Sequence, residues 1–248
     1  MKRFGLIGFP LSHSFSHKYF TEKFKQMGLS ESHRYDLFAL EYLKDFPGLW
    51  ERYPNLVGLN VTVPHKENVR RFLDRLDSSA RKVEAVNVIK KEGDKLVGYN
   101  SDYYGFKQSV LNYFQGAELV SDALILGGGG ASKAVEAVFL DLGIKYMVVS
   151  RQRAKGDLTY EDIKQNPDYL AKTGMIVNTT PLGMSPNIEG KPDLPYDVIH
   201  PEQYLYDLVY NPEETAFMRE GRQRGARTKN GLEMLHLQAD KSWEIWNS

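Results

Sequence analysis

The 248-residue sequence is 42% hydrophobic and 26% charged, which is ordinary globular composition, and its length allows one large or two modest domains. Lys plus Arg and Asp plus Glu each number 32, so a formal net charge of zero gives no indication of a nucleic-acid or anionic-membrane partner. The absence of cysteine excludes disulfides, thiolate nucleophiles and cysteine-ligated zinc, and it suits a reducing cytosol.

The N-terminal segment has a basic start followed by only a few apolar residues before Pro10 and Ser12. A signal peptide needs a longer apolar region, and a membrane-spanning helix needs about 18 or more apolar residues in a row. We therefore expect a soluble, cytoplasmic protein without a membrane partner.

The first half of the chain alternates short β-rich runs with longer helical patterns. Strands are predicted over residues 4–8, 35–40 and 57–63, and helices over 16–27, 42–53 and 65 to about 76. Runs at 86–90 and 96–99 predict a hairpin around Glu92-Gly93-Asp94. Such alternation indicates βαβ units and a parallel sheet, with an antiparallel edge at the hairpin.

The second half begins with a helix predicted from about Asp102 to Tyr113 and then repeats the alternation. Further strands are predicted over 123–126, 146–150, 175–178 and 203–208, and helices over 132–142 and 231–246. We expect the last helix to pack back on the first domain. The predicted fold is α/β, with a cleft between two domains: residues 1–101 plus 230–248, and residues 102–229.

A run of four glycines lies between the predicted strand at 123–126 and the helix that follows. The run reads Gly127-Gly128-Gly129-Gly130 and continues into Ala131 and Ser132. In this context glycines let a pyrophosphate approach backbone N–H groups at the positive end of a helix. The turn therefore predicts dinucleotide binding in a Rossmann-like domain, although Ser132 replaces the third fingerprint glycine. A plain strand–helix turn is the alternative.

The next strand ends in Ser150-Arg151-Gln152-Arg153, where an NAD site would usually place an acidic residue. A guanidinium can grip a 2′-phosphate with two hydrogen bonds, whereas a carboxylate would repel it. Arg151 and Arg153 thus predict NADP as the cofactor. The alternative is two solvated arginines after a strand.

Asn60 and Thr62 alternate with apolar residues, so they share one face of a predicted strand. Lys66 follows the carboxyl end of that strand, which is where open α/β sheets bind ligands. A lysine at that place can act as a general acid or base. Taken alone, Lys66 would more often be a surface lysine.

Three serines, Ser12, Ser14 and Ser16, follow the first strand and are expected at the same edge. Their hydroxyls could bond a substrate carboxylate or ring hydroxyl, and Ser16 could instead cap the helix that it begins. In the same way, Ser101 or Asp102 could simply cap the next long helix.

The side chains of His13, His17 and His65 are candidate ligands for a metal ion. Because no second cluster has ligand spacing, we expect no metal.

Several stretches occur in the order and spacing of one family. They are Gly8 to Ser16, Asn60 to Lys66, Ala85-Val86-Asn87, Asn100-Ser101-Asp102, Gly127 to Lys133, Asn178 to Met184, Asp207 to Pro212, and Gly231 to Leu235 with Gln238. Together they make the chain resemble the shikimate dehydrogenase family over essentially its whole length. Three departures stand out: Glu84 where the family has Gly, Val88 where it has Thr, and Ser150-Arg151-Gln152 where it has Asn-Arg-Thr. The segment between Arg153 and Met175 is also short.

The resemblance implies a role for each matching residue. Lys66 and Asp102 would be the catalytic pair, and the first domain would bind the substrate. The substrate contacts would be Ser14, Ser16, Thr62, Asn87, Asp102, Tyr210 and Gln238. Asn60 is added to them because it shares a strand face with Thr62. The NADP contacts would be Gly127, Gly128, Gly129, Gly130, Ala131, Ser150, Arg151, Arg153, Thr179, Leu208 and Gly231, and Asp77 matches an acidic position near the cofactor.

The reaction so implied is the reversible NADPH-dependent reduction of 3-dehydroshikimate to shikimate, in chorismate and aromatic amino acid biosynthesis. Lys66 would protonate the developing alkoxide, and Asp102 would hold Lys66 and a ring hydroxyl. The neighbouring carboxylate raises the lysine pKa and enclosure lowers it, and the sequence leaves that balance open. The alternatives are a quinate/shikimate dehydrogenase with relaxed substrate or cofactor choice, and a non-catalytic dinucleotide-binding regulator. A monomer or homodimer is expected.

Overall fold

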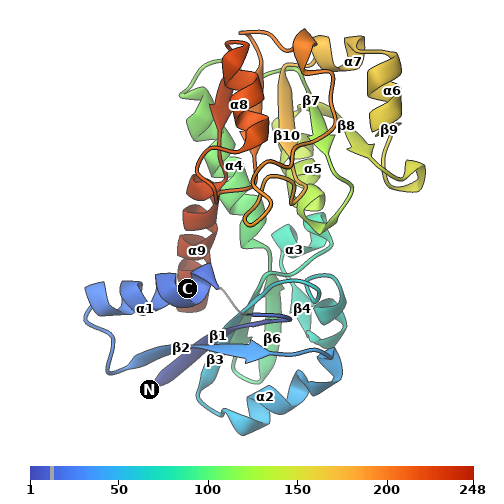
Figure 1. Ribbon diagram of the computed structural model, residues 1–248. Helices are drawn as coiled ribbons and strands as arrows, with labels where there is room; N and C mark the ends of the chain where they lie inside the picture. Colours follow the sequence, from blue (N-terminus) through green and yellow to red (C-terminus); the bar gives the residue numbers. More distant parts are fainter. Residues whose placement is uncertain (12–13) are drawn as a thin grey trace. The chain divides into compact units, whose positions relative to one another are not determined.

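A computed structural model describes residues 1–11 and 14–248, which form two compact units (Figure 1). Unit 1 comprises Met1–Tyr104 and Gln238–Ser248, and unit 2 comprises Gly105–Leu237. Helices α4 (Ser101–Phe114) and α9 (Leu232–Asn247) each contribute residues to both units. The predicted domain limits would instead assign almost all of α4 to one domain and all of α9 to the other.

Unit 1 is built on a mixed six-stranded sheet. Its strands are β1 (Lys2–Gly8), β2 (His33–Ala39), β3 (Leu56–Val61), β4 (Arg75–Leu76), β5 (Val88–Glu92) and β6 (Lys95–Tyr99). The order is β2-β1-β3-β5-β6-β4, and β5 is antiparallel to both of its neighbours. The predicted hairpin is present as β5 and β6, but it lies inside the sheet. The short strand β4 forms the edge, because it pairs in parallel with β6.

Both faces of this sheet are covered by helices (Figure 1). Phe4 and Leu6 of β1 pack with residues of α1 (Phe15–Gln26) and α9, whereas Ile7 packs in the core beside α2 (Pro47–Arg52). Neighbouring strand residues point to opposite faces, so one strand supplies both cores. The α9 end is fixed by Trp246, whose indole Nε1 donates to the Ile89 carbonyl at 3.0 Å.

Two helices predicted in unit 1 are shorter or absent. The predicted helix at 42–53 is divided into a 3₁₀ turn η1 (Leu43–Asp45) and α2, with Pro47 at the first position of α2. The predicted helix at 65–76 is wrong: this stretch holds the 3₁₀ turn η2 (Asn68–Phe72) and β4. Asp74 exchanges hydrogen bonds with Leu96, its N–H donating at 2.9 Å and its carboxylate accepting at 2.7 Å, and this pairing draws the chain into the sheet.

Unit 2 is a parallel six-stranded sheet. Its strands are β7 (Asp122–Leu126), β8 (Lys145–Ser150), β9 (Leu158–Thr159), β10 (Met175–Asn178), β11 (Tyr204–Asp207) and β12 (Arg227–Lys229). The order β12-β11-β10-β7-β8-β9, counted from β7 as the first strand, is the 3-2-1-4-5-6 order of a Rossmann fold. The predicted α/β class and Rossmann-like sheet are confirmed.

Helices lie on both faces of this sheet as well. On one face, Phe106 of α4 contacts Phe139 of α5 (Gly130–Leu142) and Tyr206 of β11 edge-to-face. The other face carries a core that includes Ile163 and Phe217. Those two residues belong to helices that the sequence did not predict: α6 (Tyr160–Gln165) and α8 (Ala216–Gln223), with α7 (Asp168–Ala171), β9 and β12 also missed. Each missed element is eight residues or shorter, too short to show a clear periodicity.

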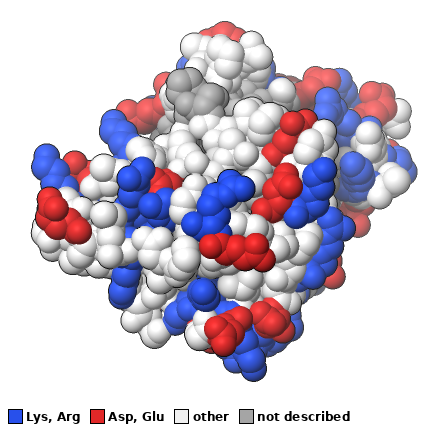
Figure 2. Space-filling model, turned by 90° about the horizontal axis from the view of Figure 1, so that it is seen from below, with Lys and Arg blue, Asp and Glu red and all other residues white. Residues whose placement is uncertain are grey.

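The connection between β8 and β9 departs from the usual α/β pattern. Parallel strands are usually joined by a helix, but this connection holds only the 3₁₀ turn η3 (Arg153–Lys155). The short segment noted in the sequence therefore begins with a connection that has no crossover helix. On the face shown in Figure 2, Lys and Arg side chains are interspersed with Asp and Glu, as expected for a zero net charge. No helix of the described residues is long and apolar enough to cross a membrane.

Candidate active site

The structure brings the two predicted catalytic residues into contact within unit 1. The Lys66 Nζ donates to Asp102 Oδ2 at 2.8 Å, and the two side chains are 30% and 20% exposed. A half-buried ion pair that solvent can still reach suits proton transfer to a bound ligand. Lys66 follows β3 and Asp102 lies in the first turn of α4, so only the fold makes them neighbours.

The turn that carries Lys66 is fixed by the residues on either side. His65 is buried, and its Nε2 bonds the Leu40 carbonyl at 2.6 Å. The Val86 N–H donates to the carbonyl of Lys66 itself at 2.8 Å. His65 is therefore a structural residue. Over residues 1–11 and 14–248, no group of three or more His, Cys, Asp or Glu could hold a metal, while His13 lies outside the described residues.

Asp102 is free to face Lys66 because other groups cap α4. The Asn100 Oδ1 accepts the N–H of Tyr103 at 3.0 Å, and the Asn87 Oδ1 accepts that of Ser101 at 2.6 Å. The alternative in which Ser101 or Asp102 is the N-cap is therefore wrong. A carboxylate in the first turn of a helix is also favoured by the helix dipole.

A buried hydrogen-bond network lies behind this pair. The Tyr35 hydroxyl donates to Asn60 Oδ1 at 2.8 Å, and Asn60 Nδ2 donates to Ser242 Oγ at 3.0 Å and to the Asn87 carbonyl at 3.3 Å. Burial raises the pKa of Tyr35, so this phenol stays neutral. Asn60 is only 5% exposed and its amide is bonded within the protein. Asn60 therefore links β3 to neighbouring segments of the protein.

The other predicted substrate residues of unit 1 lie in several elements. Ser14, and not Ser16, is the N-cap of α1, because its hydroxyl accepts the His17 N–H at 3.3 Å. Ser16 bonds the Tyr35 hydroxyl. Gln238 Oε1 accepts from the hydroxyl of Ser101 at 3.3 Å.

Three further predicted residues complete the list for this unit. Asn87 is buried and half-buried Thr62 follows β3, while Ser12 lies outside the described residues. Gly8 leaves room for Thr62, because a Cβ on Gly8 would lie 2.4 Å from the Thr62 methyl carbon.

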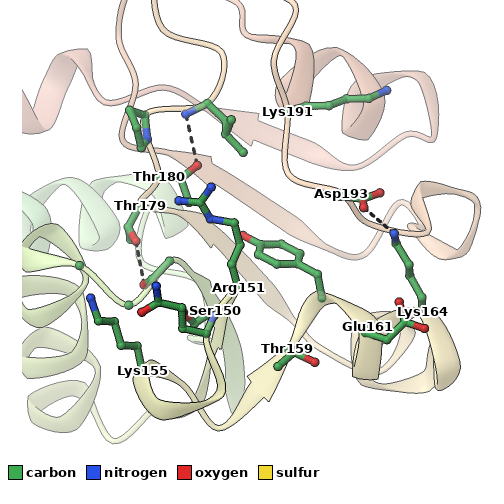
Figure 3. A pocket seen from close by; sticks show the side chains of 17 residues that line it. Ser150, Arg151, Lys155, Thr159, Glu161, Lys164, Thr179, Thr180, Lys191 and Asp193 are labelled. Carbon is green, nitrogen blue, oxygen red and sulfur yellow. Dashed lines mark hydrogen bonds and ion pairs between the residues drawn. The ribbon is translucent and has the colours of Figure 1, made fainter.

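In unit 2 the glycine turn lines a cavity of about 720 Å³ (Figure 3). Gly127 has a φ of +111°, and a Cβ on Gly128 would lie 2.1 Å from the Lys155 carbonyl oxygen. Nothing lies within 4 Å of the Cβ position of Gly129, which is the N-cap of the 13-residue helix α5. Two glycines are thus required by close packing, and the third leaves an open approach to the N–H groups of a helix. Such a cradle fits the pyrophosphate of a dinucleotide.

Basic side chains line the same cavity beyond the end of β8. Arg151 and Lys155 are among the lining residues, and neither forms an ion pair with a described residue (Figure 3). Arg153 is not among them, because its guanidinium pairs with Asp162 Oδ1 at 2.8 Å. The sequence prediction therefore named the right segment but did not include Lys155. The one indication of Lys155 in the sequence was its position two residues after Arg153.

The remaining predicted cofactor residues have varied positions. Thr179 lines the cavity, and its hydroxyl donates to the Leu126 carbonyl at 2.8 Å. Gly231 lies against Leu208, since a Cβ on Gly231 would be 2.2 Å from the Leu208 carbonyl oxygen. Asp77 is in unit 1, where its carboxylate caps α3 (Ser78–Val83).

The last four predicted residues of unit 2 are polar or lie at a helix start. Ser150 Oγ accepts the N–H of Gln152 at 3.2 Å. Gly130 and Ala131 begin α5 and are exposed, and the substrate candidate Tyr210 is 37% exposed.

Known proteins resemble this chain over nearly its whole length. Residues 6–89 match the family model of the shikimate dehydrogenase substrate binding domain. The shikimate dehydrogenase (NADP(+)) of Clostridium beijerinckii is 38% identical over 258 residues, covering 99% of this chain and 92% of that protein. The chain belongs to the shikimate dehydrogenase family.

Solved structures of this family superpose on the whole chain. Shikimate dehydrogenase 1 of Peptoclostridium difficile is 37% identical with a TM-score of 0.83, covering 100% of this chain and 92% of that one. Shikimate 5-dehydrogenase of Thermus thermophilus, solved with NADP(H) and shikimate, is 27% identical with a TM-score of 0.84, covering 99% and 93%. The resemblance predicted from the motifs is confirmed.

One departure from the shikimate dehydrogenase pattern has a clear structural consequence. Glu84, at the position where the family has glycine, is the C-cap of α3 and has a φ of +55° and a ψ of 28°. Glycine adopts this left-handed conformation without strain, whereas a residue with a Cβ is disfavoured there. The family pattern therefore reflects a backbone requirement that this chain meets with a strained glutamate.

Proposed function

We propose that this protein catalyses the reversible NADPH-dependent reduction of 3-dehydroshikimate to shikimate, a step of chorismate and aromatic amino acid biosynthesis. The observation that carries the proposal is the Lys66–Asp102 pair at 2.8 Å, in the unit that matches the family's substrate-binding domain. Unit 1 would hold the substrate, and unit 2, with its glycine turn, would hold the cofactor.

Lys66 and Asp102 are proposed as the catalytic pair. In the reductive direction the Lys66 ammonium donates a proton to the oxygen of the substrate carbonyl as that oxygen gains negative charge. Asp102 accepts a hydrogen bond from Lys66 and orients its Nζ, and its second carboxylate oxygen can hold a ring hydroxyl. In the oxidative direction the same lysine takes the proton back.

The substrate ring would be held by polar side chains from five separate places in the chain. We propose Ser14, Ser16, Thr62, Asn87, Tyr210 and Gln238 for these contacts. Asn60 supports the site through Asn87 and Ser242, because its side-chain hydrogen bonds run to Tyr35, to the Asn87 carbonyl and to Ser242 within the protein. Its replacement should therefore act through stability as well as through substrate affinity.

The cofactor would be held by the glycine turn and by the basic residues beyond β8. When bound, NADPH supplies the hydride that the protein itself cannot provide. We propose that Arg151 and Lys155 bind its 2′-phosphate, because both line the cavity and neither forms an ion pair with another described residue. Gly127, Gly128, Gly129, Ser150 and Thr179 line the same cavity. Gly130 and Ala131 begin α5, and Gly231 lies against Leu208; we propose that these four residues also contact the cofactor. The proposed cofactor contact of Asp77 has less support, since its carboxylate already caps α3.

The decisive experiment measures formation of the reduced cofactor with shikimate and NADP. It is repeated with quinate in place of shikimate, and with NAD in place of NADP. Turnover that is efficient only with shikimate and NADP is expected. Comparable turnover with quinate and NAD would indicate the relaxed quinate/shikimate enzyme, and no turnover with any pair would indicate the regulator. A cytoplasmic location and a monomer or homodimer remain part of the proposal.

A further inference from the structure

A carboxylate that this mechanism does not use is buried at the end of β11. Asp207 is 0% exposed and accepts three hydrogen bonds from neutral donors. Its Oδ1 accepts from Asn178 Nδ2 and from the Val209 N–H, each at 3.0 Å, and its Oδ2 accepts from the Thr215 hydroxyl at 2.6 Å. A buried carboxylate without a cation is costly, so its three donors must all be well placed.

The hydrogen bonds continue from Asp207 to the wall of the cofactor cavity. Asn178 Oδ1 accepts from the N–H of Thr180 at 3.0 Å and from its hydroxyl at 2.7 Å. The Thr180 hydroxyl in turn accepts the Leu182 N–H at 3.3 Å, and residues 179–182 all line the cavity (Figure 3). Asp207 therefore lies one side chain, Asn178, away from the segment that a bound cofactor would touch.

We propose that the Asp207 carboxylate is a positioning residue that fixes residues 179–182 for cofactor binding, so that protonation of Asp207 weakens the binding of NADP. This inference rests on the proposed cofactor site. It concerns binding in unit 2 alone and needs no assumption about the catalytic pair.

Protonation matters because of what surrounds the carboxylate. The nitrogens of Asn178 and Val209 can only donate, so an added proton must lie between Oδ2 and the Thr215 hydroxyl. That hydroxyl already accepts the Met218 N–H as the cap of α8, at 3.3 Å. Oδ1 then becomes a neutral carbonyl oxygen, and its bonds to Asn178 and Val209 lose the strength that a charged acceptor gives.

This protonation falls within an accessible pH range. Burial raises the pKa of Asp207 to about 6, against the opposing effect of its three hydrogen bonds. Among the described residues, Tyr196 is a titratable side chain whose pKa Asp207 helps to raise, after burial, Glu220 and Tyr160 and before Asp193. That phenol stays neutral throughout, and no histidine is among the described residues that line the cavity. Titration of Asp207 should therefore appear in the pH dependence of NADP binding.

The test compares the wild type with Asp207→Asn by measuring the Kd for NADP by calorimetry between about pH 5 and about pH 8. The variant's Kd is divided by that of the wild type at each pH, so the titration of the ligand's own 2′-phosphate cancels. The ratio should be roughly 5–10 at the high-pH end, the loss of about one charge-assisted hydrogen bond. It should fall toward 1 at the low-pH end, where the wild-type carboxyl is also neutral.

Asp122→Asn is the matched control, since the Asp122 carboxylate accepts a backbone N–H from Gly174 at 3.0 Å at the start of β7. Its ratio should stay near 1 at every pH. A ratio for Asp207→Asn that is near 1 throughout, or that is large and independent of pH, overturns the proposal. A purely structural role predicts the second pattern.

If Asp207→Asn does not fold, Thr215→Val replaces it, because this change removes one donor that favours the ionised form. The ligand is then NADH, because it has no 2′-phosphate to titrate. As the pH is lowered, the variant should lose affinity for NADH at a higher pH than the wild type does. An unchanged midpoint of this pH dependence overturns the proposal. The readout is binding, so wild-type protein that binds NADP but does not oxidise shikimate would refute the proposed reaction only. Wild-type protein that binds no NADP would refute both.

Discussion

Replacing Lys66 by methionine is the sharpest test of the catalytic pair. Methionine keeps most of the bulk and removes the ammonium whose Nζ contacts Asp102 at 2.8 Å. Loss of a general acid–base group lowers turnover by about 10²–10⁴, or about 3–5 kcal/mol in activation free energy. The lysine side chain is only 30% exposed, and methionine retains most of its buried packing contacts, so the variant should fold.

The assay follows NADPH formation from shikimate, with binding measured separately. The turnover rate should fall by the factor above, while the Kd for shikimate changes far less, because Ser14, Thr62 and Gln238 would still hold the ring. The Kd for NADP should not change. Asp102→Asn should also reduce turnover, and the double variant should lose less than the product of the single losses, since the two side chains act as a unit. A Lys66→Met protein with nearly the parent turnover would refute the proposed mechanism, though not family membership.

Four other predictions concern binding, stability and pH. Arg151→Ala should raise the Kd for NADP about 10–100-fold and leave that for NAD nearly unchanged, whereas Arg153→Ala should change neither; equal effects of the two would contradict the assignment from the cavity. Ser14→Ala should raise the KM for shikimate and also reduce the free energy of unfolding by about 0.5–2 kcal/mol, through loss of the α1 cap, and calorimetry with kinetics separates the two effects. Glu84→Gly should raise the free energy of unfolding by about 0.5–1 kcal/mol at unchanged turnover, and a destabilised variant would contradict the strained φ. The pKa of Asp207 is raised from 3.8 to about 6. Its contribution to stability is therefore present below about pH 4 and is lost as the pH rises through about 6. The melting temperature of Asp207→Asn, relative to that of the wild type, should rise across that interval.

Much of the fold could be predicted because its decisive signals are local. The apolar run at 123–126, the four glycines and the helix after them form a strand–turn–helix whose pattern is contained in about twenty residues. The long helices α4 and α9 were likewise predicted from periodicity. Strand β4 was not, because two residues carry no period and its hydrogen bonds come from β6, about twenty positions away.

The sequence by itself determined the α/β class, the dinucleotide turn, the basic segment after β8 and the motifs of the family. It also named Lys66 and Asp102, as two residues 36 positions apart in the chain. Only the tertiary structure decided that the two side chains meet, that Lys155 rather than Arg153 lines the cavity, and that Asn60 supports the site from within. The physical reason is that a side chain's role depends on which partners reach it. Arg153 is held by Asp162 and Asn60 by Tyr35 and Ser242, and no local pattern in the chain encodes those partners.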